Sequence, residues 1–150
     1  MQECLPILNT GLRGFTVAST RISDVDGSAG KLVYRGYLVK DLAESATFEE
    51  VAYLLLYEKL PDKNELAAFK EKLSKERPIP AELIAALQTR PKTALPMDIL
   101  QAGISMLAHH DPDIADTSRA SLLKMAIRLI ARLPTIVAAW DRIRNGKEPV

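Results

Sequence analysis

Few side chains in this sequence could carry out chemistry, and its two histidines are the first candidates. His109 and His110 are adjacent and are followed by Asp111 and Asp113. Neighbouring residues on a helix point about 100° apart, so adjacent imidazoles are poorly placed to flank one substrate. Their segment is typical of a helix end, where an imidazole interacts favourably with the helix dipole. We therefore favour a helix-end role over catalysis, and over a weak metal site with Asp111 or Asp113, because no third ligand stands at a fixed helical spacing.

Three further charged residues have both a functional and a structural interpretation. Arg35, in the run Tyr34-Arg35-Gly36-Tyr37, could bind an anion, but an arginine that donates to backbone carbonyls at a turn is the favoured interpretation. Asp24 and Asp26 are spaced like a carboxylate pair. Aspartates beside a glycine are typical of a turn, however, and they need no chemistry to explain them.

The remaining candidates are weaker still. The segment Gly11-Leu12-Arg13-Gly14 is too short for a phosphate-binding loop and lacks its strand-to-helix context. Ser19, Thr20 and Ser105 have no histidine within foreseeable reach, and Cys4 is expected to be inert. We therefore assign no catalytic, cofactor-binding or metal-binding residue to this chain.

Composition predicts an ordinary globular domain. The chain has 150 residues, 47% hydrophobic and 26% charged, with a net charge of +1 and no basic stripe, which argues against nucleic-acid binding. The single cysteine, Cys4, excludes an internal disulfide and favours a reducing, cytoplasmic compartment. No signal peptide is expected. Lys124, Arg128 and Arg132 interrupt the most apolar stretch, so no membrane span is expected either.

The elements that would position these residues differ along the chain. Five of the seven glycines fall between residues 11 and 37, and β-favouring residues flank Asp26-Gly27, which predicts a short hairpin. From Val39 onward the apolar residues recur at helical spacing. This pattern predicts an all-α, multi-helical fold with a short N-terminal β hairpin.

Five helices can be placed from the sequence. Thr47 with Glu50 and Asp62 with Glu65 form capping boxes, and prolines separate the next two helices. The first helix is apolar around most of its circumference, so we expect it to be buried. The first expected helix begins at Thr47. The other four span 62–76, 80–87, 97–108 and 117–144.

Small residues and prolines add detail to the last two helices. Ala102 and Gly103 would let another backbone approach closely. Pro134 interrupts the hydrogen-bond pattern of the longest helix, so we expect a bend near Leu133. Asn145-Gly146 is a plausible helix stop.

These landmarks, in their order, resemble the N-terminal region of the citrate synthases and 2-methylcitrate synthases. No single motif is decisive, but the ordered set covers nearly the whole chain. The matching segments are Ile22–Gly27, Leu32–Tyr37, Asp41–Ala43, Thr47–Ala52, Leu54–Pro61, Pro96–Leu100 with Ile104-Ser105, and Asp111–Asp113.

The resemblance implies both a reaction and a domain plan. Family members condense acetyl-CoA or propionyl-CoA with oxaloacetate, and coenzyme A enters as a substrate thioester, so no cofactor is expected. Residues 1–37 would form an arm and hairpin, 38–145 the helical part of the large domain, and 146–150 a truncated linker.

Two departures from the family pattern qualify this expectation. Leu95 replaces the histidine that usually precedes Pro96-Met97. Family chains are also more than twice as long, and their catalytic histidines, aspartate and substrate-binding arginines lie beyond the point where this chain stops. We therefore expect the isolated chain to be catalytically silent.

Two hypotheses follow. In the first, the chain is the N-terminal portion of such an enzyme and contributes scaffold and dimer contact, with the C-terminal portion and a second copy as its partners. In the second, it is a non-catalytic helical association module or a split-gene subunit. A helical domain of unrelated function is a third alternative.

Overall fold

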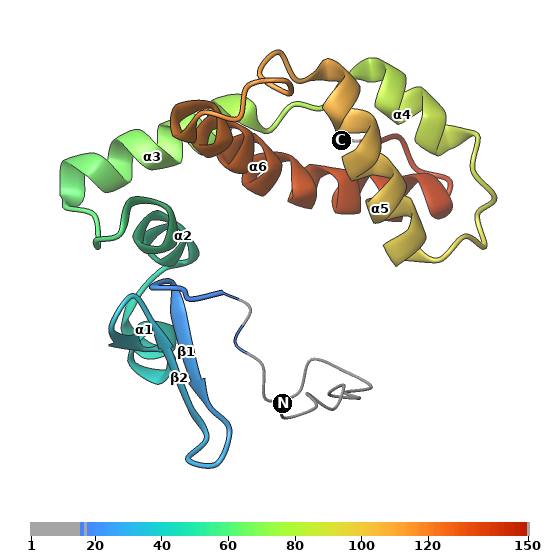
Figure 1. The fold of residues 1–150 in the computed structure, drawn as a ribbon. Coiled ribbons are helices and arrows are strands. Elements are labelled where there is room, and N and C mark those ends of the chain that lie inside the picture. Colours follow the sequence, from blue (N-terminus) through green and yellow to red (C-terminus); the bar gives the residue numbers. More distant parts are fainter. Residues whose placement is uncertain (1–15, 17, 150) are drawn as a thin grey trace, which may run out of the picture. The chain divides into compact units, whose positions relative to one another are not determined.

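The computed structural model describes residues 16 and 18–149, which divide into two compact units (Figure 1). The first unit extends to Thr47 and the second begins at Phe48. Each unit is described separately below.

The described residues of the first unit form a small antiparallel sheet and one short helix. Strands β1 (Ser23–Asp26), β2 (Lys31–Tyr34) and β3 (Tyr37–Leu38) pair in sequence order, and α1 (Val39–Ser45) follows. The β1–β2 hairpin predicted from Asp26-Gly27 is confirmed. The two-residue strand β3 was not predicted, because its pairing depends on the turn that precedes it.

That turn has the backbone geometry of a tight hairpin. Tyr34 pairs with Tyr37, and both intervening residues are left-handed, with φ of 47° at Arg35 and 92° at Gly36. A two-residue turn of this kind requires positive φ at both positions. Gly36 adopts it without strain, whereas Arg35 has a side chain that disfavours it.

The second unit is entirely helical in its regular elements, and the predicted helices are confirmed with small shifts at their ends. Each proline predicted at a helix start lies at or just before one. The elements are α2 (Phe48–Tyr57), α3 (Lys63–Glu76), α4 (Ala81–Gln88), α5 (Pro96–Leu107), the single 3-10 turn η1 (Ala108–His110) and α6 (Arg119–Arg144). Among the described residues, no helix is both long enough and apolar enough to cross a membrane.

Two helix ends show why local sequence predicted them well. The Asp62 carboxylate accepts from the backbone N–H of Asn64 and Glu65, each at 2.8 Å, and the Glu65 carboxylate accepts from the Asp62 N–H at 3.0 Å. This is the predicted capping box. At the far end of α6, Gly146 has a φ of 70°, and the N–H of Lys147 donates to the Arg142 carbonyl at 2.9 Å. The left-handed Gly146 and this hydrogen bond are features of a Schellman motif, which ends the helix.

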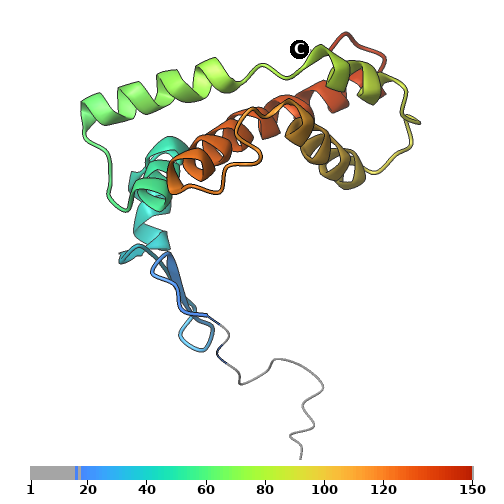
Figure 2. The same ribbon diagram turned by 45° about the horizontal axis from the view of Figure 1, so that its top comes forward.

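Helix α6 lies against α3 at one end and against α5 at the other (Figures 1 and 2). Ile127 and Ala131 pack in a cluster with residues of α2 and α3, whereas Ile136, Trp140 and Ile143 pack in a second cluster with residues of α4 and α5. Ile127 and Ile136 are nine residues apart. At about 100° per residue, they point to opposite sides of the helix.

The other predicted features of the helices have mixed outcomes. Ala52, Tyr53 and Leu54 of α2 are buried, but Phe48 is 67% exposed, so the expectation of a buried helix was wrong at its first residue. Apolar periodicity cannot distinguish a face that packs against this chain from a face that is left open. Helix α6 continues through Pro134, and the bend near Leu133 stays a prediction.

Gly103 is closely packed, although by side chains and not by the backbone that the sequence predicted, and its neighbour Ala102 is exposed. A Cβ at this buried position would meet Cγ2 of Ile136 at 3.2 Å and Cδ1 of Leu83 at 3.9 Å. The missing side chain therefore lets α5 pack tightly against α6 and α4. This glycine contributes to the chain's own core.

Candidate functional site

The two histidines lie on η1, directly after α5, as the sequence predicted for a helix end. Both side chains are exposed. Within the described residues, no group of three histidine, cysteine, aspartate or glutamate side chains is arranged to hold a metal ion.

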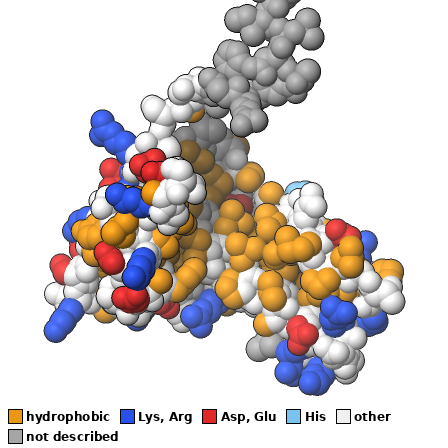
Figure 3. All heavy atoms as spheres, turned by 90° about the horizontal axis from the view of Figure 1, so that it is seen from below, with side chains coloured by type: hydrophobic (Ala, Val, Ile, Leu, Met, Phe, Trp, Pro, Cys, Tyr) orange, Lys and Arg blue, Asp and Glu red, His pale blue; other side chains and the backbone are white. Residues whose placement is uncertain are grey.

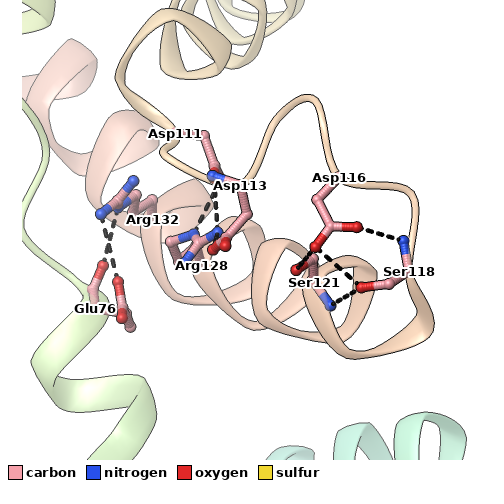
Figure 4. Close-up of polar contacts among 8 residues, drawn as sticks. All are labelled: Glu76, Asp111, Asp113, Asp116, Ser118, Ser121, Arg128 and Arg132. Atoms are coloured by element: carbon pink, nitrogen blue, oxygen red, sulfur yellow. Dashed lines mark hydrogen bonds and ion pairs between the residues drawn. The ribbon is translucent and has the colours of Figure 1, made fainter.

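The aspartates that follow the histidines bind an arginine. Arg128 of α6 donates from Nε to Asp111 Oδ2 at 2.9 Å and from an Nη to Asp111 Oδ1 at 2.6 Å. It also donates to Asp113 Oδ2 at 2.5 Å (Figure 4). The Arg128 and Asp111 side chains are only 11% and 10% exposed. We call these three residues the Arg128 clamp.

In the Arg128 clamp, hydrogen bonds between opposite charges offset the free-energy cost of removing those charges from water. Burial alone would raise the pKa of Asp111, but hydrogen bonds from the Asp113 backbone N–H and the Arg128 guanidinium outweigh it and lower that pKa. Burial likewise opposes the charge of Arg128, and its bonds to Asp113 and Asp111 raise its pKa. Asp111 and Arg128 therefore stay ionised at neutral pH. The clamp fixes the segment after η1 to the middle of α6.

Two neighbouring polar contacts reinforce this arrangement (Figure 4). Arg132, one turn after Arg128, donates to the Glu76 backbone carbonyl at 3.2 Å and ties the end of α3 to α6. Asp116 accepts from the Ser118 N–H at 2.8 Å and from the buried Ser121 hydroxyl at 2.7 Å. These hydrogen bonds lower the pKa of Asp116 and help to start α6.

A mostly apolar cavity of about 280 Å³ lies beside the Arg128 clamp, lined by Ser105, Leu107, Met125 and Leu129 among others. The Ser105 hydroxyl donates to the Gln101 carbonyl of its own helix at 3.1 Å. Among the charged groups at the cavity wall, Arg128 is bonded to Asp111, and Arg132 is bonded to Glu76. The Ser105 hydroxyl and these charged groups are therefore all engaged in bonds within the chain.

The candidates in the first unit are engaged in turns. Asp26 Oδ1 accepts from the Ser28 hydroxyl at 2.6 Å and from the Ala29 N–H at 3.0 Å, and these bonds lower the pKa of Asp26. Asp26 is therefore bonded within its own turn, whereas Asp24 lies in strand β1. The Arg35 backbone N–H donates to the Ile22 carbonyl at 2.9 Å.

Other candidates add little. Thr20 Oγ1 accepts from the Ile22 N–H at 3.1 Å, and Ser19 is exposed. Cys4 and the segment Gly11–Gly14 lie outside the described residues.

The Arg128 clamp was not predicted from the sequence, in which Arg128 and Arg132 were interpreted only as charges that interrupt an apolar stretch. Their spacing of four residues places them on one side of a largely apolar helix, and this was the available signal that buried acidic partners exist.

Comparisons with known proteins are consistent with one another. A family model described as "Citrate synthase, C-terminal domain" matches residues 11–150. The chain is 44% identical over 145 residues to a 2-methylcitrate synthase of Shewanella oneidensis, covering 97% of this chain and 38% of that protein. It is 38% identical to a citrate synthase of Acidithiobacillus ferridurans, covering 97% of this chain and 39% of that protein.

A solved structure shows the same fold. It is the ternary complex of carboxymethyl coenzyme A and oxaloacetate with citrate synthase from Thermoplasma acidophilum. It superimposes with a TM-score of 0.86 at 28% identity and covers 93% of this chain and 36% of that one. The chain therefore spans little more than a third of the relatives it matches.

The Arg128 clamp yields a prediction about stability and pH. Replacing Arg128 with Met leaves the partly buried carboxylates of Asp111 and Asp113 without their cation, which should lower the free energy of unfolding by about 1–3 kcal/mol at pH 7. Because the folded pKa of Asp111 is lowered, the clamp's contribution is full above about pH 4 and disappears as pH falls through the folded value. Urea unfolding of both proteins between pH 3 and pH 7 measures this difference.

The matched control is Arg119→Met, which removes the exposed ion pair with Glu58. Exposed pairs contribute little, so its midpoint should stay close to that of the parent. Equal effects of the two variants, or a difference that does not change with pH, would show that the clamp does not stabilise the fold.

Proposed function

We propose that this chain, which belongs to the citrate synthase family, is the N-terminal portion of a citrate or 2-methylcitrate synthase. The complete enzyme would remove a proton from the carbon beside the acyl-CoA carbonyl. The resulting enol would attack the ketone carbon of oxaloacetate and form a carbon–carbon bond. Hydrolysis of the thioester would then release citrate or methylcitrate and the coenzyme A thiol.

The substrates in this proposal come from the relatives. Several carry the names citrate synthase or 2-methylcitrate synthase, and the Thermoplasma acidophilum enzyme was crystallised with oxaloacetate and a coenzyme A derivative. Acetyl-CoA and propionyl-CoA are both retained as the acyl donor, because relatives of both names match over the same share of the chain.

We assign this segment a scaffold role. The observation that carries it is the Arg128 clamp, in which the guanidinium is bonded to two carboxylates and is not free for an anionic substrate. His109 and His110 are exposed on a helix end, where they do not face each other across a pocket. Acid–base catalysis by this segment alone therefore has no support. A cytoplasmic location belongs to the same proposal and rests on the single cysteine, Cys4.

A second candidate function is a helical association module or a split subunit. Figure 3 shows hydrophobic side chains gathered on one face of the second unit. Leu122, Leu129 and Val137 of α6 are exposed, and their spacing brings them within about a quarter-turn of one another on the helix. A stripe of this kind is typical of a contact surface. We propose that this stripe forms part of a homodimer contact. Such a contact is compatible with both candidate functions.

The catalytic part of the proposal is tested by release of coenzyme A thiol. The purified chain should release none above background from acetyl-CoA or propionyl-CoA with oxaloacetate. When the chain replaces the matching 145 residues of the Shewanella oneidensis relative, the resulting chimera should regain thiol release. Turnover by the chain alone would refute the scaffold role, and an inactive but folded chimera would favour the association module.

The dimer is tested with two leucines of equal exposure. Leu129 on α6 and Leu60 after α2 are both 36% exposed. A buried charge at a contact is costly, so Leu129→Glu should weaken self-association at least tenfold, whereas Leu60→Glu should not. Light scattering across a concentration series measures the mass. A monomeric parent, or equal effects of the two variants, would contradict a dimer through the α6 stripe.

A further inference from the structure

Helix α6 ends in the pair Asn145-Gly146, which the sequence predicted only as a helix stop. The Gly146 backbone nitrogen can reach the side-chain carbonyl carbon of Asn145, Cγ, because the two atoms close a five-membered ring. Both residues are exposed, and glycine has no side chain to hinder this approach. The end of α6 therefore carries a nucleophile and an electrophile that the proposed function does not use.

The folded helix end holds both reacting groups in hydrogen bonds. The Gly146 N–H donates to the Ile143 carbonyl at 3.1 Å. The Asn145 side-chain amide donates from Nδ2 to the Asp141 carbonyl at 2.7 Å and to Asp141 Oδ1 at 3.2 Å. These bonds direct the Gly146 N–H and the Asn145 amide back along α6. A reaction between the two groups therefore requires the helix end to open.

This opening is local. Among the described residues, Ile143 is the last buried residue of the chain, with 3% of its surface exposed, whereas residues 144–148 are exposed. The Lys147 N–H donates to the Arg142 carbonyl at 2.9 Å and closes the helix end. Segments with few buried contacts and exposed hydrogen bonds open at a low free energy compared with core elements. The end of α6 can therefore open while the core around Ile143 stays folded.

We propose that Asn145 is a self-modification site whose rate is set by opening of the α6 end. In the open state, the Gly146 nitrogen attacks Asn145 Cγ, a nitrogen–carbon bond forms, and the Cγ–Nδ2 bond breaks. The proton from the Gly146 nitrogen leaves with the amide as ammonia, and a succinimide ring remains. Water then opens the ring at either of its two carbonyl carbons and gives aspartate or isoaspartate. Water is the co-reactant, and no electron is transferred.

Either product weakens the helix end that controlled its formation. The new carboxylate replaces an amide donor, so the bonds to Asp141 are lost and a second negative charge stands beside the Asp141 carboxylate. This charge also lies at the C-terminal end of α6, where the helix dipole disfavours it. Isoaspartate adds one carbon to the backbone before Gly146, which disrupts the bond from Lys147 to Arg142. The modification therefore leaves the end of α6 permanently open.

Two other segments of the described chain provide internal comparisons. Asp26-Gly27 could form the same ring, but an ionised carboxylate resists attack. The hydrogen bond from the Ser28 hydroxyl, together with others in its turn, lowers the pKa of Asp26 and keeps it ionised. Asn64 lies in the first turn of α3 and precedes Glu65, whose side chain hinders the attack. Neither segment combines an amide with an unhindered backbone nitrogen.

The experiment follows deamidation in the purified chain at pH 7.4 and in a synthetic peptide of residues 140–149, which is too short to keep the helix end closed. Mass spectrometry of the digested chain records the mass increase at Asn145, and electron-transfer fragmentation separates isoaspartate from aspartate. Asn145 in the chain should deamidate at least tenfold faster than Asn64. It should deamidate at least tenfold slower than the same residue in the peptide.

Lys147→Pro and Lys147→Ala test the control by the helix end. Proline removes the N–H that donates to the Arg142 carbonyl, whereas alanine keeps it. Each variant is compared with its own peptide, which corrects for any effect on the chemical step. Lys147→Pro should react within about twofold of its peptide, and Lys147→Ala should retain the tenfold protection.

Deamidation of Asn145 no faster than that of Asn64 would overturn the modification site. Equal rates in the parent chain and its peptide, or equal protection in the two Lys147 variants, would overturn control by the α6 end. A product without isoaspartate would also contradict the proposal, because ring opening at both carbonyl carbons must give it.

Discussion

Helix α6 contributes to both hydrophobic cores of the second unit, and the two cores lie on opposite sides of its axis. The packing of the whole unit depends on this arrangement. Ile127 contributes to the core with α2 and α3, and Ile136, Trp140 and Ile143 contribute to the core with α4 and α5. The change of side occurs around Pro134. Regular amphipathic helices bury a single stripe, so a helix that buries two must be long and must leave part of its surface for other contacts. The exposed Leu122, Leu129 and Val137 of α6 are consistent with that requirement.

The polar groups serve the same architecture. The Arg128 clamp holds the segment between η1 and α6 against the helix, Arg132 ties the end of α3 to it, and Asp116 helps to start it. A buried ion pair contributes little net stability compared with apolar packing, but removal of one partner is strongly destabilising. Such a pair therefore specifies where the segment must lie. Asp111 and Asp113, which the sequence offered as possible metal ligands, instead fix the position of this segment, which is consistent with the proposed scaffold role.

Local features could be predicted from the sequence, and features that depend on distant partners could not. The Asp62–Glu65 capping box, the start of α5 at Pro96 and the stop at Gly146 involve neighbours within a few residues, and all three are confirmed. The partners of Arg128 lie 15 and 17 residues away, and strand β3 depends on the preceding turn. The exposure of Phe48 depends on what packs over it. That this chain contributes no catalytic residue stays a prediction.

If α6 joins the two cores into one cooperative unit, hydrogen exchange measured along α6 should report a single opening. Amides near Ile127 and near Ile136 should exchange through the same global opening, with equal opening free energies and equal denaturant dependence. If amides before Pro134 exchange through a separate opening of much lower free energy than those after it, the two cores are independent. In that case α6 is not the element on which the unit depends.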